Sequence, residues 1–198
     1  MLTVGEDGWL REGAAHLASS HFDARPEGES PYLVVMHNIT LPPGRFLTGC
    51  VEDFFLGHLD YSLDPTLESL RGVRVSSHFF IRRTGDVVQF VSTLERAWHA
   101  GVSRFEGRER CNDFSIGIEM EGTDFEAFDE RQYAVLLPLL EALGRRHPIR
   151  AVVAHSDIAP GRKTDPGPYF DWRRLYFQRD RFGAPAFPGP AARKALGW

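Results

Sequence analysis

Residues 154–171 read AHSDIAPGRKTDPGPYFD. The segment places His155 directly after an apolar run and brings Lys163 and Asp165 into the loop that follows. Imidazole and carboxylate are good ligands for a borderline cation such as zinc, and a lysine two residues away can place positive charge beside the metal. A catalytic zinc needs three protein ligands and one open position for water. The segment therefore predicts part of a metal site whose remaining ligand lies elsewhere in the chain.

A second apolar run supplies the candidate. Residues 32–36 (YLVVM) predict a buried strand whose last residue is His37, and residues 150–154 (RAVVA) predict another that ends on His155. Open α/β sheets place their sites where such strands end. Either histidine alone is compatible with a satisfied hydrogen bond at a strand end. Together with the loop that carries Asp165, the two histidines favour a metal site.

Residues 111–122 (CNDFSIGIEMEG) alternate between apolar and polar or small residues with a period of two, which predicts a strand. Glu119 and Glu121 would then share the face opposite the isoleucines. A carboxylate near an activated water can accept its proton. A solvated sheet face that carries two acids explains the same spacing, so this pattern leaves both interpretations open.

Five motifs together resemble the AmpD family of 1,6-anhydro-N-acetylmuramoyl-L-alanine amidases, within the wider amidase-2 and peptidoglycan-recognition superfamily. They are residues 37–44 (HNITLPPG), 96–103 (RAWHAGVS), 107–119 (GRERCNDFSIGIE), 155–160 (HSDIAP) and 163–168 (KTDPGP), and the resemblance runs from about residue 8 to about residue 175. It implies a zinc enzyme with His37, His155 and Asp165 as metal ligands. It also implies Glu119 as the general base and Lys163 as the group that stabilises the transition state.

The substrate that the resemblance implies is a soluble anhydro-muropeptide, cleaved between the lactyl group of anhydro-N-acetylmuramic acid and L-alanine. Its stem peptide carries carboxylates, which arginine binds in a bidentate manner. Arg74 and Arg110 match the substrate-binding arginines of the family, and Asn38 and Trp98 match positions that line the groove. An ordinary surface charge is the alternative for each arginine, and the match favours substrate binding. For the histidines His78 and His99, positions behind the metal ligands or in the groove both stay open.

One segment departs from the family pattern. Many relatives carry an aromatic residue just after the proline of the segment that here reads LDPTL, residues 63–67. This chain has Thr66 and Leu67 there, so we expect no tyrosine contribution to oxyanion stabilisation from this position.

The whole composition is that of an ordinary globular protein. The chain has 198 residues, of which 42% are hydrophobic and 25% charged, and its net charge of −4 suggests neither nucleic acid nor an anionic membrane as a partner. Residues 1–8 lack the apolar core of a secretory signal, so we expect a cytoplasmic protein; protein partners stay unknown. Cys50 and Cys111 have no metal-ligand spacing and are expected to be structural, reduced thiols.

The remaining patterns predict an α/β fold: a single domain, residues 1–175, with a central mixed sheet flanked by helices. Residues 78–91 predict a hairpin that turns at Gly85, and helices are expected at about 51–59 and at 130–146, the latter capped by Asp129 and bent by Pro138. Residues 176–198 are rich in proline, glycine and alanine. Such a composition buries little surface and is usually a flexible or wrapped extension. We therefore expect removal of the residues after about Arg181 to leave activity intact.

Two other functions compete with this hypothesis. A related lytic amidase would share the metal ligands but cleave intact cell-wall polymer, which requires export or phage-mediated lysis. A non-catalytic peptidoglycan sensor would use the same fold but lack the full metal set. The presence of all five matched residues, the three metal ligands with Glu119 and Lys163, favours an enzyme.

Overall fold

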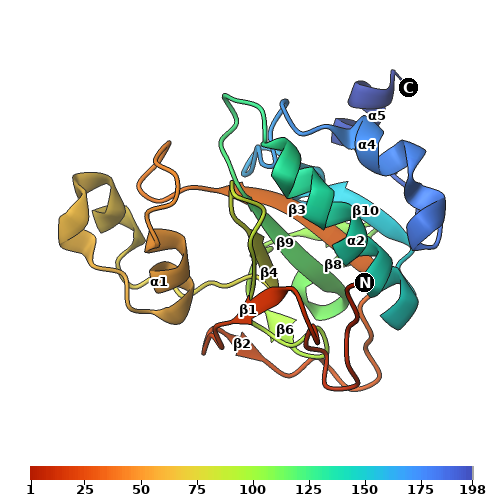
Figure 1. Ribbon diagram of the computed structural model, residues 1–198, viewed down its shortest axis with the longest axis horizontal. Helices are drawn as coiled ribbons and strands as arrows, with labels where there is room; N and C mark the ends of the chain where they lie inside the picture. Colours follow the sequence, from red (N-terminus) through yellow and green to blue (C-terminus); the bar gives the residue numbers. More distant parts are fainter. Residues whose placement is uncertain (198) are drawn as a thin grey trace.

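The computed structural model describes residues 1–197, and its centre is a six-stranded sheet (Figure 1). In spatial order the strands are β1 (Ala14–His16), β5 (Val87–Gln89), β4 (Phe79–Ile81), β9 (Ser115–Glu121), β3 (Leu33–Ile39) and β10 (Ala151–Ala154). All neighbours are parallel except β4 and β5, which form the antiparallel hairpin predicted around Gly85. The sequence prediction of a single domain with a mixed sheet flanked by helices is confirmed.

The other elements are short except for one helix. They are β2 (Phe22–Asp23) paired with β6 (Arg96–Ala97), β7 (Arg104–Phe105) paired with β8 (Arg108–Glu109), the helices α1 (Cys50–Leu56), α2 (Glu130–Arg146), α3 (His155–Ile158), α4 (Trp172–Phe177) and α5 (Pro190–Leu196), and the 3-10 helices η1 (Tyr61–Leu63), η2 (Pro65–Leu70), η3 (Cys111–Phe114) and η4 (Arg179–Phe182). Helix α1 ends at Leu56, three residues before the predicted boundary, because the following Gly57 adopts the left-handed conformation that closes a helix.

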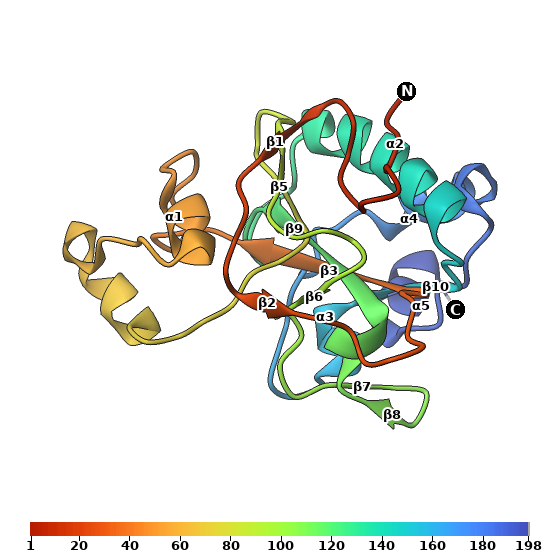
Figure 2. The same ribbon diagram turned by 90° about the horizontal axis from the view of Figure 1, so that it is seen from below.

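One face of the sheet packs against α2 (Figure 2). The helix begins at the predicted capping box of Asp129 and Gln132, and its Leu136, Leu140 and Leu143 contact the sheet as part of the main core. Full burial of such a side chain stabilises the fold by about 1.5–3 kcal/mol. The apolar stripe of α2 is therefore core, as predicted, and leaves the opposite face of the sheet to carry polar groups.

The opposite face is covered in two places. Near β4 and β5 it packs against α1, whose Phe54 and Phe55 are buried, and the segment of α1, η1 and η2 projects away from the sheet (Figure 1). Near β3 and β10 it packs against a smaller cluster that includes Cys111 and Phe114. Both cysteines are buried and unpaired, as expected. The polar site described below lies between these two apolar clusters.

The segment after α4 is wrapped along the edge of the sheet beside β10 (Figure 2). Its Phe182, Phe187 and Ala192 are buried in the main core. The proline-rich and glycine-rich composition led us to expect little buried surface here. The difference arises because a few widely spaced apolar residues fill the gap between α2 and β10. Within residues 1–197, no helix combines the length and apolar character needed to cross a membrane.

Candidate metal and catalytic site

The register of three parallel strands brings the predicted site residues together. His37 of β3 is the register partner of Glu119 of β9, and Met36 of β3 pairs with Ala154 of β10, so His155 follows directly at the same level. Neither histidine is the last residue of its strand, in contrast to the prediction: His37 lies two residues before the end of β3, and His155 follows the end of β10 and begins α3. Alternation along the strands points His37 and Glu119 away from α2.

Three side chains converge there on one point. His37 Nδ1 lies 2.9 Å from His155 Nδ1 and 3.1 Å from Asp165 Oδ2, and the latter oxygen lies 3.1 Å from His155 Nδ1. These atoms form a nearly equilateral triangle, and both histidines are buried. The structure thus brings together the three residues that the sequence proposed as metal ligands.

The hydrogen bonds behind the two rings show that this donor set fits a cation. His155 Nε2 faces the carbonyl oxygen of Ala100 at 3.1 Å, which only a protonated Nε2 can satisfy, so neutral His155 presents a bare Nδ1 to the triangle. His37 Nε2 contacts His99 Nδ1 at 3.0 Å, and His99 Nε2 contacts Ser115 Oγ at 3.2 Å. The lone pair of His155 Nδ1 and the Asp165 carboxylate repel each other at 3.1 Å, and a cation in the triangle would relieve this repulsion. Imidazole and carboxylate ligands suit zinc.

The surroundings of the triangle lower the pKa values of His37 and Asp165. Burial, the neighbouring His155 and the Lys163 charge lower the pKa of His37 to about 4, although Asp165 opposes the shift. Burial opposes ionisation of Asp165, but its close contacts with the His155 and His37 rings hold the pKa of this carboxyl well below its usual range. His37 is therefore neutral and Asp165 ionised at neutral pH, which are the forms of these two groups that bind a metal.

Glu119 lies next to this cluster without being part of the triangle. Its Oε1 is 3.9 Å from His37 Nδ1, and its Oε2 is buried without a hydrogen-bond partner among residues 1–197. Burial, followed by the Asp165 charge, raises the pKa of Glu119 well above its ordinary value, while Lys163 acts in the opposite direction. A buried carboxylate oxygen with no protein partner has room to accept a proton from a bound water. Glu119 is 8% exposed, so the interpretation of a solvated sheet face is wrong.

The neighbouring acid on the same face has a different role. Glu121 is buried, and its two oxygens accept hydrogen bonds from the backbone N–H groups of Leu47 and Arg83. It anchors two loops to the end of β9. Only Glu119 is directed to the cluster.

A cavity of about 300 Å³ opens onto the cluster and is lined by Glu119, His155, Lys163 and Asp165, with an apolar wall that includes Phe54 and Phe55. A second cavity, of about 530 Å³, shares Lys163 and Asp165 and extends along Asn38 and residues 122–125. Lys163 is exposed, in a loop held by its backbone N–H bond to Ala159. An ammonium group at the junction of two cavities can reach an extended ligand.

The four residues predicted to bind substrate are less closely grouped. The amide of Asn38 lines both cavities and donates to Asp124 Oδ1 at 2.7 Å. The exposed guanidinium of Arg74 lies 5.6 Å from the ring centre of Trp98. Arg110 lines a third cavity of about 570 Å³, which meets the second at Arg162.

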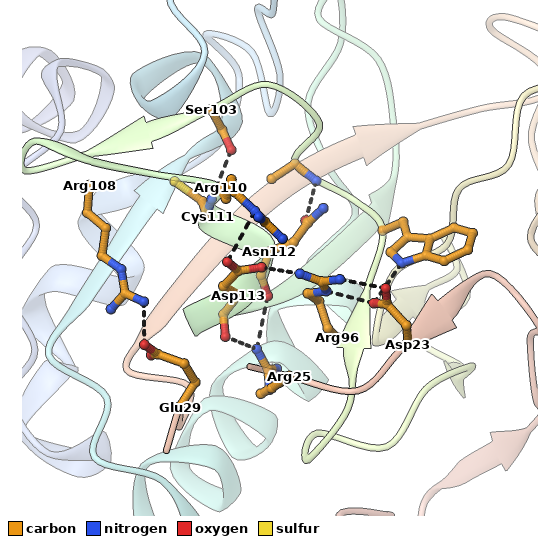
Figure 3. Close-up of polar contacts among 12 residues, drawn as sticks. Asp23, Arg25, Glu29, Arg96, Ser103, Arg108, Arg110, Cys111, Asn112 and Asp113 are labelled. Carbon is orange, nitrogen blue, oxygen red and sulfur yellow. Dashed lines mark hydrogen bonds and ion pairs between the residues drawn. The ribbon is translucent and has the colours of Figure 1, made fainter. Parts of the chain in front are cut away.

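A charged network holds Trp98 and Arg110 in place (Figure 3). Arg96 bridges Asp23 and Asp113; the indole N–H of Trp98 donates to Asp23 at 3.0 Å, and Arg110 lies 3.3 Å from Asp113. These contacts connect Trp98 and Arg110, two of the four substrate-binding candidates, through one polar network.

Sequence reasoning missed one contact and left another open. His99 lies directly behind His37, and Gly117 makes room for it, because a Cβ at position 117 would lie 2.5 Å from His99 Cγ. The glycine in the middle of a strand was the available signal. His99 also lines the cavity of about 300 Å³ at the cluster, whereas His78 lies further back, is fully buried and accepts the backbone N–H of Gly117. Thr66 is exposed and Leu67 fully buried, and neither lines the cavities at the cluster.

The chain is similar to known proteins in sequence and in fold. The sequence profile of the N-acetylmuramoyl-L-alanine amidases matches residues 27–168. The 1,6-anhydro-N-acetylmuramyl-L-alanine amidase AmpD of Citrobacter freundii is 50% identical over 172 residues, which cover 86% of this chain and 91% of that protein. A crystal structure of a selenomethionine derivative of AmpD matches with a TM-score of 0.85 and 47% identity, over 90% of this chain and 99% of that one.

A more distant structure contains a ligand. The complex of the amidase AmiD from Escherichia coli with its substrate anhydro-N-acetylmuramic acid-L-Ala-D-γ-Glu-L-Lys matches with a TM-score of 0.57 and 29% identity, over 96% of this chain and 68% of that one. The extent of the profile match and the identity to AmpD decide the classification. The chain belongs to the AmpD group of the N-acetylmuramoyl-L-alanine amidase family.

Proposed function

We propose that this protein is a zinc-dependent N-acetylmuramoyl-L-alanine amidase that cleaves the amide between 1,6-anhydro-N-acetylmuramic acid and L-alanine of anhydro-muropeptides, a reaction of cell-wall recycling. The observation that carries the proposal is the triangle of His37, His155 and Asp165 beside the unpaired buried oxygen of Glu119. The names of the AmpD relatives and the ligand in the AmiD complex support the substrate class.

His37, His155 and Asp165 would hold the zinc through the atoms that form the triangle. When bound, zinc supplies Lewis-acid activation of water and of the scissile carbonyl. Glu119 accepts the proton of the attacking water at its free oxygen. It returns that proton to the alanine nitrogen as the C–N bond breaks, so the products are the anhydro sugar acid and the free stem peptide.

Lys163 acts on the charge that develops at the carbonyl oxygen. Its ammonium group lines both cavities at the cluster and is close enough to Glu119 and His37 to lower the pKa of each. A fixed positive charge at this place stabilises the oxyanion more than it stabilises the neutral carbonyl. Arg74 and Arg110 would bind carboxylates of the stem peptide, while Asn38 and Trp98 would line the groove.

The decisive experiment compares two substrates. Purified protein is incubated with soluble anhydro-muropeptide and, separately, with intact sacculi, and the products are identified by mass. We expect efficient release of stem peptide from the soluble substrate alone. Comparable release from sacculi would favour the lytic amidase, and binding without turnover of either substrate would favour the sensor. The cytoplasmic location remains part of the proposal and is tested by cell fractionation.

A further inference from the structure

The C-terminal tail, defined here as residues 178–197, extends the sheet beside the strand that leads to His155. Ala186 donates its N–H to Arg150 O at 2.8 Å and accepts from Val152 N at 3.0 Å. Strand β10 is otherwise the edge of the sheet, with only β3 as a neighbour. The tail therefore pairs with the free edge of the strand whose end places His155 in the triangle.

A second contact joins the tail to the turn that carries His155. Asp157 accepts the N–H of Ala154 on Oδ2 at 2.8 Å, and it accepts the N–H of Ala191 on Oδ1 at 2.9 Å. The two donors belong to different segments. Ala154 directly precedes His155, and Ala191 lies in the first turn of α5 in the tail. One half-buried carboxylate thus connects the tail to the backbone of the metal-ligand segment.

The close approach depends on Gly189. A Cβ at this position would lie 1.9 Å from Asp157 Oδ2, so any larger residue must displace the carboxylate. Glycine at position 189 has an ordinary φ of −69°, so the close contact and not backbone strain requires it. Burial of Phe187 and Ala192 in the core then keeps the two sides of the contact in place.

We infer that the tail is a positioning element for the metal site, and that Asp157 is the positioning residue that transmits its effect to His155. The inference rests on the metal role of His155 in the proposed function. A shift of the Ala154 backbone moves the His155 imidazole, whose Nδ1 has to lie about 3 Å from both other ligand atoms. This positioning role contradicts the expectation, drawn from the composition, that the tail can be removed without effect on activity.

The test measures zinc affinity by competition with a chelator for the full chain and for the variants Asp157→Ala and Gly189→Ala. Asp180→Ala is the matched control, because Asp180 is an exposed carboxylate of the same tail. Loss of partners that orient metal ligands typically costs about 10–100-fold in affinity. We expect a loss of this size in both test variants, an altered absorption spectrum of their cobalt-substituted forms, and neither effect in the control.

Thermal unfolding of the metal-free proteins separates positioning from general stability. Unchanged zinc affinity and cobalt spectrum in folded Asp157→Ala and Gly189→Ala would overturn the inference, whatever their melting temperature, because the tail would then only cover the sheet edge. Should Asp157→Ala fail to fold, Gly189→Ala decides, since it keeps the carboxylate and adds one methyl group. Absence of zinc binding by the unmodified chain would instead refute the metal role of His155 and, with it, the proposed function.

Discussion

Glu119 and His37 are direct register partners on the parallel strands β9 and β3, yet they are assigned different tasks. The Nδ1 atom of His37 completes the ligand triangle, whereas the Glu119 carboxylate stays 3.9 Å away with one oxygen unpaired. The register of a sheet defines this separation, since a slip of one residue would turn Glu119 to the opposite face. The register of β3 and β9 therefore decides which residue lies in the ligand triangle and which lies beside it as the proposed base.

The first prediction separates the two acids of β9. Glu119→Gln should retain zinc but lose about 10²–10⁴-fold in turnover, because it removes the proton acceptor without touching a ligand. Glu121→Gln should instead lower the free energy of unfolding by about 1–3 kcal/mol, since an amide cannot accept from both Leu47 and Arg83. Elemental analysis, hydrolysis rates and denaturant unfolding check both variants. A metal-free Glu119→Gln protein would show that Glu119 is a ligand.

The second prediction concerns Asp165. Replacement by alanine should abolish both zinc binding and activity, because two histidines alone make a poor zinc site. The histidines should remain folded in place, each held by a bond from its other ring nitrogen. Zinc content and hydrolysis rate are measured together, and a fully loaded Asp165→Ala protein contradicts the assignment.

The third prediction concerns the charge at Lys163. Lys163→Met should keep zinc content and unfolding temperature, because the side chain is exposed, but reduce kcat by about 10²–10³-fold through loss of oxyanion stabilisation. Lys194→Met, which changes an exposed lysine of the tail, is the matched control and should leave kcat unchanged. An equal kcat for the Lys163 variant and the unmodified chain would remove Lys163 from the mechanism.

The fourth prediction tests the support behind His37. Gly117→Ala should displace His99, whose Cγ would lie 2.5 Å from the new Cβ, and so break its contact with His37 Nε2. We expect zinc affinity to fall about 10–100-fold. Ser115→Ala, which removes only the far partner of His99, should have a smaller effect. Chelator competition gives both affinities, and unchanged binding in Gly117→Ala would mean that His99 does not orient its neighbour.

The fifth prediction concerns pH and a histidine remote from the triangle. Burial, aided by the charges of Arg146 and Arg25, lowers the pKa of His147 to about 4, against about 6.5 in an unfolded chain. As pH falls, His147 therefore takes up a proton in the unfolded state before it does so in the folded state. The free energy of unfolding is unaffected by this residue above about pH 6.5 and decreases as pH falls toward 4. The size of this decrease is at most roughly 3 kcal/mol.

Denaturant unfolding at pH 7 and pH 5 checks this expectation by difference. His147→Gln should lose less stability between the two pH values than the unmodified chain, because the substitution removes the buried group whose protonation opposes folding in this range. An identical pH dependence would show that His147 is not responsible.

The motifs alone were sufficient for the fold class, and they named the three proposed ligands whose side chains the structure brings together. Apolar runs before His37 and His155 predict adjacent buried strands, and the capping box at Asp129 with its leucine stripe predicts α2. These signals are local, because periodicity and capping act within a few residues. They left open whether Glu119 and Glu121 face solvent, since alternation alone cannot tell which side of a sheet is covered.

Tertiary structure decided the rest. Only the β3–β9 register separates Glu119, with its unpaired oxygen, from Glu121, whose oxygens bind two loops. Only folding brings His99 behind His37, 62 residues away in the chain. The tail shows the same limit: its composition predicts little burial, but Phe187 packs into the core and Asp157 binds Ala191 across 34 residues. Such contacts depend on which distant surfaces meet, and no local pattern in the sequence encodes that.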